Sequence, residues 1–180
     1  MRRSCPLGSV ATLSRVVFAL LAFGALPAPA VAQADAVVVY LVRHSERAED
    51  GTNDPPISQA GEERSAQVAT LLQDAGITHI HTTDFKRTRA TGAPSAAMTG
   101  LQMELYDPRD LAAFAGQLSR TPGRHLVLGH SNTTPQLVEA LGGDPGTPIE
   151  EMEYDRLYIV TLTAEGTSTV LLRFGSPYQG

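Results

Sequence analysis

Short apolar runs alternate with amphipathic stretches along the chain. The clearest run, VVVYLV at residues 37–42, is continuous and rich in β-branched valine, which is typical of a strand buried on both faces. The pattern predicts strands over residues 36–42, 77–82, 101–106, 125–128, 156–163 and 167–174. Helices are expected over residues 59–75, 85–98, 109–119 and 134–141.

The first predicted helix follows Ser58, which can cap its N-terminus, and Gly76 suits the position beyond its end. Its apolar stripe consists of Val68, Ala69, Leu72 and Ala75. Its charged residues are expected to face solvent: Glu62, Glu63 and Arg64. In the second helix, Pro94 is expected to cause a bend or an early end.

Strands that alternate with helices predict an α/β fold. We expect a three-layer αβα sandwich around a mixed, mostly parallel sheet. The last two predicted strands would turn around Gly166 and close an antiparallel edge of that sheet.

Residues 1–32 have the pattern of a secretory signal peptide that is cleaved. Arg2, Arg3 and Arg15 precede or flank an apolar segment at residues 16–26, and small residues in the order Ala-x-Ala follow it. The apolar segment is shorter than the roughly 20 residues of a membrane span. We therefore expect residues 33–180 to form a single domain that is exported to a bacterial periplasm or secreted, with no membrane span after cleavage.

Cleavage would remove three arginines and the one cysteine, Cys5, and would change the formal net charge from −5 to −8. So acidic a domain lacks the basic surface of a nucleic-acid-binding protein. Without cysteine it can form neither disulfides nor thiolate metal sites, and it has no cysteine nucleophile.

Polar residues follow three of the predicted strands: Arg43 and His44; Thr83 and Asp84, with Arg87; Gly129 and His130, with Ser131 and Asn132. If these strands are parallel, the clusters meet at one sheet edge, where open α/β sheets bind ligands. Two guanidinium groups can hold a tetrahedral oxyanion, and a neutral imidazole between them can attack phosphorus. A second imidazole can stabilise charge in the transition state.

These clusters resemble the motifs of the histidine phosphatase superfamily, also called the phosphoglycerate mutase-like family. LVRHSE at residues 41–46 is similar to its opening Arg-His-Gly block, with Ser45 in place of the usual glycine. DPPISQAG at 54–61, TDFKRTRAT at 83–91 and VLGHS at 127–131 resemble three later blocks, in the family's order.

The resemblance implies a small phosphatase with a phosphoglycerate mutase-like fold. His44 would be the nucleophile that becomes phosphohistidine, and Arg43 and Arg87 would hold the phosphoryl group. His130 would complete the pocket, and water would hydrolyse the phosphoenzyme. No metal or cofactor is implied, and the substrate would be a phosphorylated small molecule or a phosphoprotein.

The general acid that protonates the leaving group is left open between three carboxyl groups: Asp107, Glu46 and Glu104. Asp107 is preferred because it lies past a strand end, although its surroundings also fit a turn with a helix cap. Ser45 is expected either to narrow the pocket or to add a hydroxyl donor. Asn132 is expected in a helix cap and is also a candidate to touch the substrate.

His79 and His81 alternate on a predicted strand, as a pair of metal ligands can, but no third ligand is near in the sequence, which favours a structural role. Two alternatives to a phosphatase remain. A phosphomutase of the phosphoglycerate type fits the same motifs, although its substrates are cytoplasmic. A non-catalytic phosphate-binding module fits the departure at Ser45 and the uncertain acid. The oligomeric state is not readable from the sequence.

Overall fold

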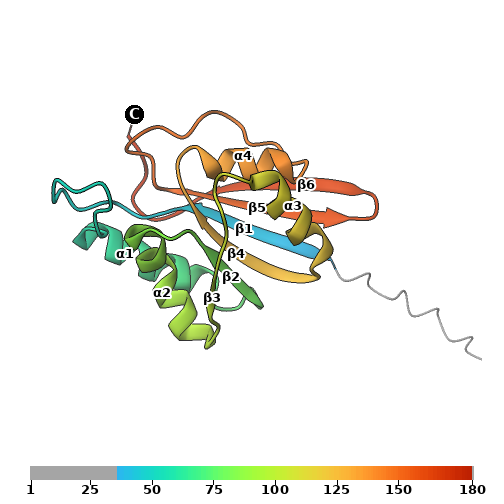
Figure 1. Cartoon of the computed structure of the whole chain (residues 1–180), viewed down its shortest axis with the longest axis horizontal. Helices are drawn as coiled ribbons and strands as arrows, with labels where there is room; N and C mark the ends of the chain where they lie inside the picture. Colours follow the sequence, from blue (N-terminus) through green and yellow to red (C-terminus); the bar gives the residue numbers. More distant parts are fainter. Residues whose placement is uncertain (1–35, 180) are drawn as a thin grey trace, which may run out of the picture. The chain divides into compact units, whose positions relative to one another are not determined.

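A six-stranded sheet in the order β3-β2-β4-β1-β5-β6 forms the centre of the computed structural model, which describes residues 36–179 (Figure 1). The strands are β1 (Val37–Arg43), β2 (His79–Thr82), β3 (Met103–Leu105), β4 (Gly123–Gly129), β5 (Arg156–Thr163) and β6 (Gly166–Arg173). The first four run parallel, and β5 and β6 are antiparallel to their neighbours. The predicted mixed sheet is confirmed, whereas the predicted signal peptide lies outside the described residues.

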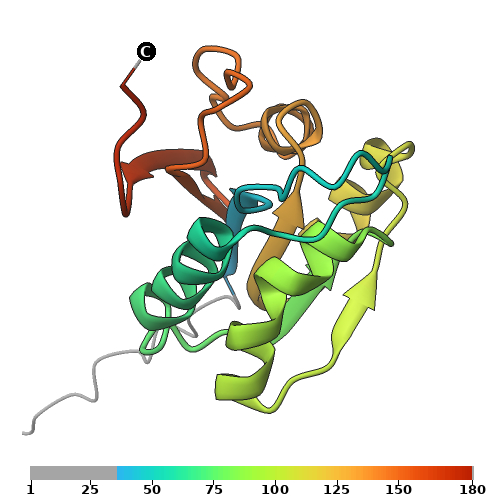
Figure 2. The same cartoon turned by 90° about the vertical axis from the view of Figure 1, so that its left-hand side faces the viewer.

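Two pairs of helices cover the two faces of the sheet (Figure 2). They are α1 (Gln59–Leu71), α2 (Lys86–Thr99), α3 (Leu111–Arg120) and α4 (Thr133–Ala140). Side chains alternate along a strand, so β1 sends Tyr40 and Val42 into the core under α1 and α2, and Val39 and Leu41 into the core under α3 and α4. The three-layer αβα architecture is thus confirmed. Among residues 36–179, no helix is both long and apolar enough to cross a membrane.

Two expectations for the helices were wrong. Arg64 is buried, because its guanidinium reaches Glu46 at 2.8 Å and the carbonyls of Phe174 and Ser176 at 3.0 and 3.1 Å. The helical period placed it on the solvent face, but a long charged side chain can be buried when every donor finds a partner. Helix α1 also ends at Leu71, four residues before the predicted end.

Pro94 does not end α2, which continues to Thr99 and stops at Gly100 in the left-handed conformation. A proline removes one hydrogen-bond donor, but tertiary packing holds the rest of this helix. Gly92 lies directly on the side chains of Met103 and Leu128, where a Cβ would come within 3.1 Å of either. The stabilisation that α2 gains by packing closely against the sheet therefore outweighs the loss of one backbone hydrogen bond at Pro94.

Three histidines form a stack across β2 and β4, outside the pocket described below. His81 Nε2 lies 3.0 Å from His125 Nδ1, and the His79 ring is stacked on the His125 ring at 4.6 Å. His125 Nε2 donates to the Thr121 carbonyl, which leaves its Nδ1 to accept from His81. No third ligand lies near His79 and His81 in the sequence, but the fold brings His125 to them. Even so, residues 36–179 hold no group of three or more side chains arranged to bind a metal.

We expect this stack to make the domain sensitive to acid. Burial, followed by the charges of His125 and His79, lowers the pKa of His81 to about 4. An unfolded histidine has a pKa of about 6.5, so the stabilisation is complete above that pH and is lost as the pH falls toward 4. Between pH 7 and pH 4.5, wild type should lose about 2 kcal/mol more unfolding free energy than His81→Gln. Urea titrations at both pH values measure this, and equal losses would contradict it.

Candidate active site

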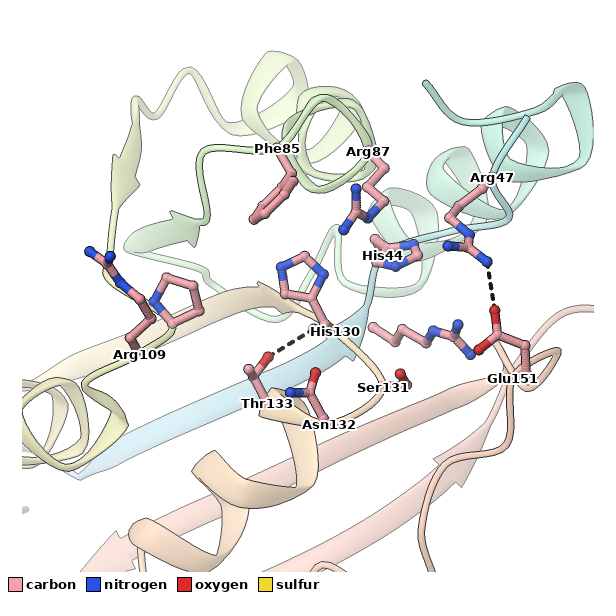
Figure 3. A pocket seen from close by; sticks show the side chains of 12 residues that line it. His44, Arg47, Phe85, Arg87, Arg109, His130, Ser131, Asn132, Thr133 and Glu151 are labelled. Carbon is pink, nitrogen blue, oxygen red and sulfur yellow. Dashed lines mark hydrogen bonds and ion pairs between the residues drawn. The ribbon is translucent and has the colours of Figure 1, made fainter. Parts of the chain in front are cut away.

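The carboxyl ends of β1, β2 and β4 meet at a pocket of about 370 Å³ (Figure 3). The parallel register brings the predicted polar clusters together there. Five of the predicted site residues line this pocket: Arg43, His44, Arg87, His130 and Asn132. Four of its lining residues are arginines, namely Arg43, Arg47, Arg87 and Arg109, so the pocket is suited to an anion.

His44 lies at the end of β1, where its backbone N–H donates to the Gly129 carbonyl at 2.9 Å. Its ring Nδ1 is 2.8 Å from the Ser45 carbonyl. A carbonyl only accepts hydrogen bonds, so Nδ1 carries the proton and Nε2 keeps its lone pair. Burial lowers the pKa of His44 to about 3, and the charges of Arg43, His130 and Arg87 contribute further. The imidazole is therefore neutral at physiological pH, as a nucleophile must be.

Arg43 and Arg87 are each held on one side and leave a donor unused. The Arg43 guanidinium lies 4.1 Å from the centre of the Tyr154 ring, and Arg87 lies 4.4 Å from that of Phe85. Asp54 is 3.4 Å from Arg87 Nη1. In both arginines Nε is buried and has no hydrogen-bond partner among residues 36–179. These two atoms have no surface open to the pocket, whereas neither arginine uses its Nη2 in a hydrogen bond within residues 36–179, so Nη2 is the group left to donate to an oxyanion.

His130 faces His44 across the pocket, with 5.5 Å between the ring centres (Figure 3). Its backbone N–H donates to Thr133 Oγ1 at 3.0 Å, and its Nε2 lies 3.1 Å from Thr83 Oγ1. Burial, with the charges of Arg87 and Arg43, lowers the pKa of His130 to about 4. A bound phosphoryl dianion would oppose the effect of the two arginines, so His130 is placed to donate a hydrogen bond to it.

The preferred candidate acid, Asp107, does not line the pocket, although its neighbours Pro108 and Arg109 do. Its carboxylate accepts two hydrogen bonds from the Arg109 side chain, at 2.9 and 2.8 Å, and one from the Arg109 backbone. These bonds hold the pKa of Asp107 at about 2. The Asp107 carboxylate is therefore ionised and bound to Arg109, which agrees with the alternative interpretation of this segment as a turn.

The other two candidate acids lie elsewhere as well. Glu104 is part of β3, where side chains project from the faces of the sheet, and its carboxylate is 3.7 Å from His81. Glu46 forms an ion pair with Arg64 at 2.8 Å and lines a separate cavity. The structure therefore brings none of the three predicted acids to the pocket.

Ser45 also differs from expectation, because it neither lines nor narrows the pocket. Its hydroxyl donates to Ser65 Oγ at 3.0 Å, which in turn donates to the Gly61 carbonyl. Its backbone N–H donates to Thr91 Oγ1 at 2.9 Å. The side chain at the position where the resemblance implies glycine thus contacts α1, where it is buried, and does not line the pocket.

Sequence reasoning missed two charged residues at the pocket mouth, Arg47 and Glu151. Arg47 comes from the loop after β1 and Glu151 from the segment before β5, and their side chains form an ion pair at 2.6 Å. Glu151 is the one carboxylate that lines the pocket in the part of the chain that the structure describes. Nothing in the local sequence points to this pair, because the two residues are 104 positions apart.

Comparisons with known proteins point to one family. Residues 39–110 match the family model described as "Histidine phosphatase superfamily (branch 1)". "Probable phosphoglycerate mutase GpmB" of Escherichia fergusonii is 43% identical over 77 residues, which cover 39% of this chain and 35% of that protein. The protein of the same name from Escherichia coli is 36% identical over 106 residues, 56% of this chain and 49% of the relative. The match thus spans half the length of these curated relatives or less.

Solved structures share the fold. The "protein histidine phosphatase SixA complexed with tungstate" superposes with a TM-score of 0.61 at 21% identity, over 75% of this chain and 94% of the other. A "putative alpha-ribazole-5'-P phosphatase" from Escherichia coli gives 0.65 at 13% identity, over 77% and 97%. At these identities the likeness concerns the fold alone, and it covers nearly the whole of each neighbour.

Proposed function

Because residues 39–110 match the model of the histidine phosphatase superfamily, we propose that this chain hydrolyses phosphorylated substrates through a phosphohistidine on His44. The observation that carries the proposal is a neutral imidazole whose Nε2 is left free by the Ser45 carbonyl. It stands beside Arg43 and Arg87, whose Nη2 groups form no hydrogen bond within residues 36–179 and suit a phosphoryl dianion.

The residues of the pocket divide the work of two phosphoryl transfers. In the first, His44 Nε2 bonds to phosphorus while the bond to the leaving group breaks and its electron pair departs with that group. Arg43, Arg87 and His130 neutralise the equatorial oxygens in the transition state. In the second, water attacks phosphorus, the N–P bond breaks, and inorganic phosphate leaves His44 in its starting form.

The pocket also supports a proposal about the leaving group. Glu151 is the one carboxylate lining it among residues 36–179, and Arg47 binds that carboxylate at 2.6 Å. An alkoxide leaves poorly without a proton donor, whereas the imidazole of a phosphohistidine or a nitrophenolate leaves without one. We therefore propose substrates of this second kind, and a solved neighbour is itself a "protein histidine phosphatase".

A substrate panel tests this proposal. We expect phosphoramidate and p-nitrophenyl phosphate to be hydrolysed with kcat/KM at least about 100-fold above that of glycerol phosphate, the low end of what general acid catalysis contributes. During turnover, a phosphoenzyme that is labile in acid and stable in base should be trapped. Equal hydrolysis of the alkyl ester would contradict the leaving-group proposal, and the absence of any phosphoenzyme would contradict the mechanism.

The names of the curated relatives favour a second candidate, a phosphomutase. The two functions differ in the acceptor of the second transfer, which is water in a phosphatase and a phosphoglycerate hydroxyl in a mutase. Labelled phosphoenzyme mixed with 3-phosphoglycerate separates them. Release of label as inorganic phosphate, unchanged by the added acceptor, is expected for the phosphatase.

A further inference from the structure

A groove runs from the pocket along α4. Ser131 and Asn132 line both cavities, so the groove is continuous with the place where the phosphoryl group would bind. Its volume of about 370 Å³ equals that of the pocket itself. A substrate no larger than phosphoramidate fills only the pocket, so the groove is available to a larger leaving group.

The groove is largely apolar, and its far wall is fixed in place. Its apolar lining comes from Pro135, Pro145, Pro148 and Ile149. Buried Arg156 donates to the Pro148 carbonyl at 3.1 Å, and the Tyr158 hydroxyl donates to the Pro145 carbonyl at 2.9 Å. Fixed walls lower the entropic cost of binding. The amide side chains of Asn132 and Gln136 lie along the same groove and can bond to the backbone of an extended peptide.

The charge of the groove is opposite to that of the pocket. Glu139 is the one charged residue of its lining, and residues 131–155 contain no Lys, Arg or His. Glu139 and the exposed Glu150 take part in none of the ion pairs formed within residues 36–179. An arginine-rich pocket therefore adjoins a groove with uncompensated negative charge. A substrate that fits both carries an anionic phosphoryl group next to an apolar or cationic portion.

We infer that this groove binds the residues flanking the phosphorylated residue of a polypeptide substrate, and that it favours an apolar residue followed by Lys or Arg. The inference rests on the proposed function for the site that holds the phosphoryl group. It adds a substrate class, a phosphorylated protein segment, and assigns Glu139 to its recognition.

Binding of two matched peptides tests the inference without requiring turnover. Each is fluorescent and carries a non-hydrolysable phosphonate in place of the phosphoryl group, followed by Leu-Lys in one and Leu-Glu in the other. At low ionic strength, wild type should bind the Lys peptide about 3- to 5-fold more tightly, the scale of one exposed charge pair. Glu139→Lys should reverse this preference, and added salt should weaken it.

Glu63→Lys is the matched control, because it makes the same charge change at an exposed position of α1 outside the groove. It should keep the wild-type preference for the Lys peptide. Equal affinities for the two peptides in wild type, or the same response to both substitutions, would overturn the inference. Hydrolysis of phosphoramidate by wild type and by Glu63→Lys, which should be equal, reports separately on the proposed function.

Discussion

Replacing His44 by Gln is expected to lower kcat/KM for p-nitrophenyl phosphate by at least about three orders of magnitude, or about 4 kcal/mol in transition-state stabilisation. Glutamine fills similar space and can still donate to the Ser45 carbonyl, but it has no lone pair on nitrogen that can attack phosphorus. The loss should fall on kcat, because Arg43, Arg87 and His130 remain to bind the phosphoryl group. Steady-state kinetics and trapping of the phosphoenzyme measure it.

His79→Gln provides the control for this substitution. This substitution makes the same change of side chain on β2, but His79 stacks on His125 and does not line the pocket. It should keep turnover within about 2-fold of wild type. If His44→Gln turned over the ester at a comparable rate, another nucleophile would have to be sought. Circular dichroism of both variants separates a loss of chemistry from a loss of fold.

The residues that form the pocket were predictable where their positions follow from strand order. Arg43, His44 and His130 lie at or directly after strand ends, and parallel pairing places all such ends at one edge. Arg87 lies in the first turn of the helix that follows β2. For these four residues, the local sequence pattern and the strand topology both predict a position at the pocket, so the sequence was enough to identify them.

The rest of the site was not predictable, because it depends on loops whose paths are set by long-range contacts. Glu151 and Tyr154 approach β1 from more than 100 residues away. Ser45 and Asp107 were assigned to the pocket from their positions beside strand ends, but hydrogen bonds to Ser65 and Arg109 direct their side chains elsewhere. Side-chain direction at a strand end is decided by such partners, which a sequence does not display.

Arg43 shows how strongly the site depends on a distant segment. Its Nη1 donates to the carbonyls of Glu150 and Glu153, at 2.8 and 3.0 Å, and its guanidinium lies over the ring of Tyr154. All three partners belong to the short segment before β5. The orientation of the phosphate-binding guanidinium therefore follows the backbone of this segment.

A buried ion cluster fixes that backbone. The Glu153 carboxylate, 2% exposed, accepts from Arg156 Nε at 2.7 Å and from its Nη2 at 2.9 Å. It also accepts from the Glu150 N–H at 3.0 Å, and half-exposed Arg173 donates to it as well. Burial by itself would raise the pKa of Glu153. The hydrogen bonds act in the opposite direction with a larger combined effect, and the pKa is lowered to about 2. Glu153 is thus a positioning residue that acts on Arg43 through two carbonyl groups.

We expect Glu153→Gln to impair both stability and the binding of phosphate. It leaves the Arg156 guanidinium buried without its counter-charge, at a cost of about 3–5 kcal/mol, which corresponds to a decrease in Tm of about 10 °C. With the carbonyls released, Arg43 should lose its fixed orientation, and the Kd for tungstate, a phosphate mimic, should rise at least about 10-fold at temperatures where the variant is folded. Calorimetry measures both quantities.

Arg173→Gln distinguishes this role from a general effect of the ion cluster. It removes a half-exposed partner of Glu153 and of the buried Asp155 carboxylate, but leaves the buried pair of Glu153 and Arg156 intact. Because Asp155 loses its counter-charge, the Tm of this variant should fall as well, but its tungstate affinity should stay unchanged, since Arg173 forms no hydrogen bond with Arg43 or with the two carbonyl groups that Arg43 binds. If Glu153→Gln lost stability but bound tungstate as wild type does, the cluster would support the fold without orienting Arg43. If Glu153 orients Arg43, tungstate should bind more weakly to Glu153→Gln and with wild-type affinity to Arg173→Gln.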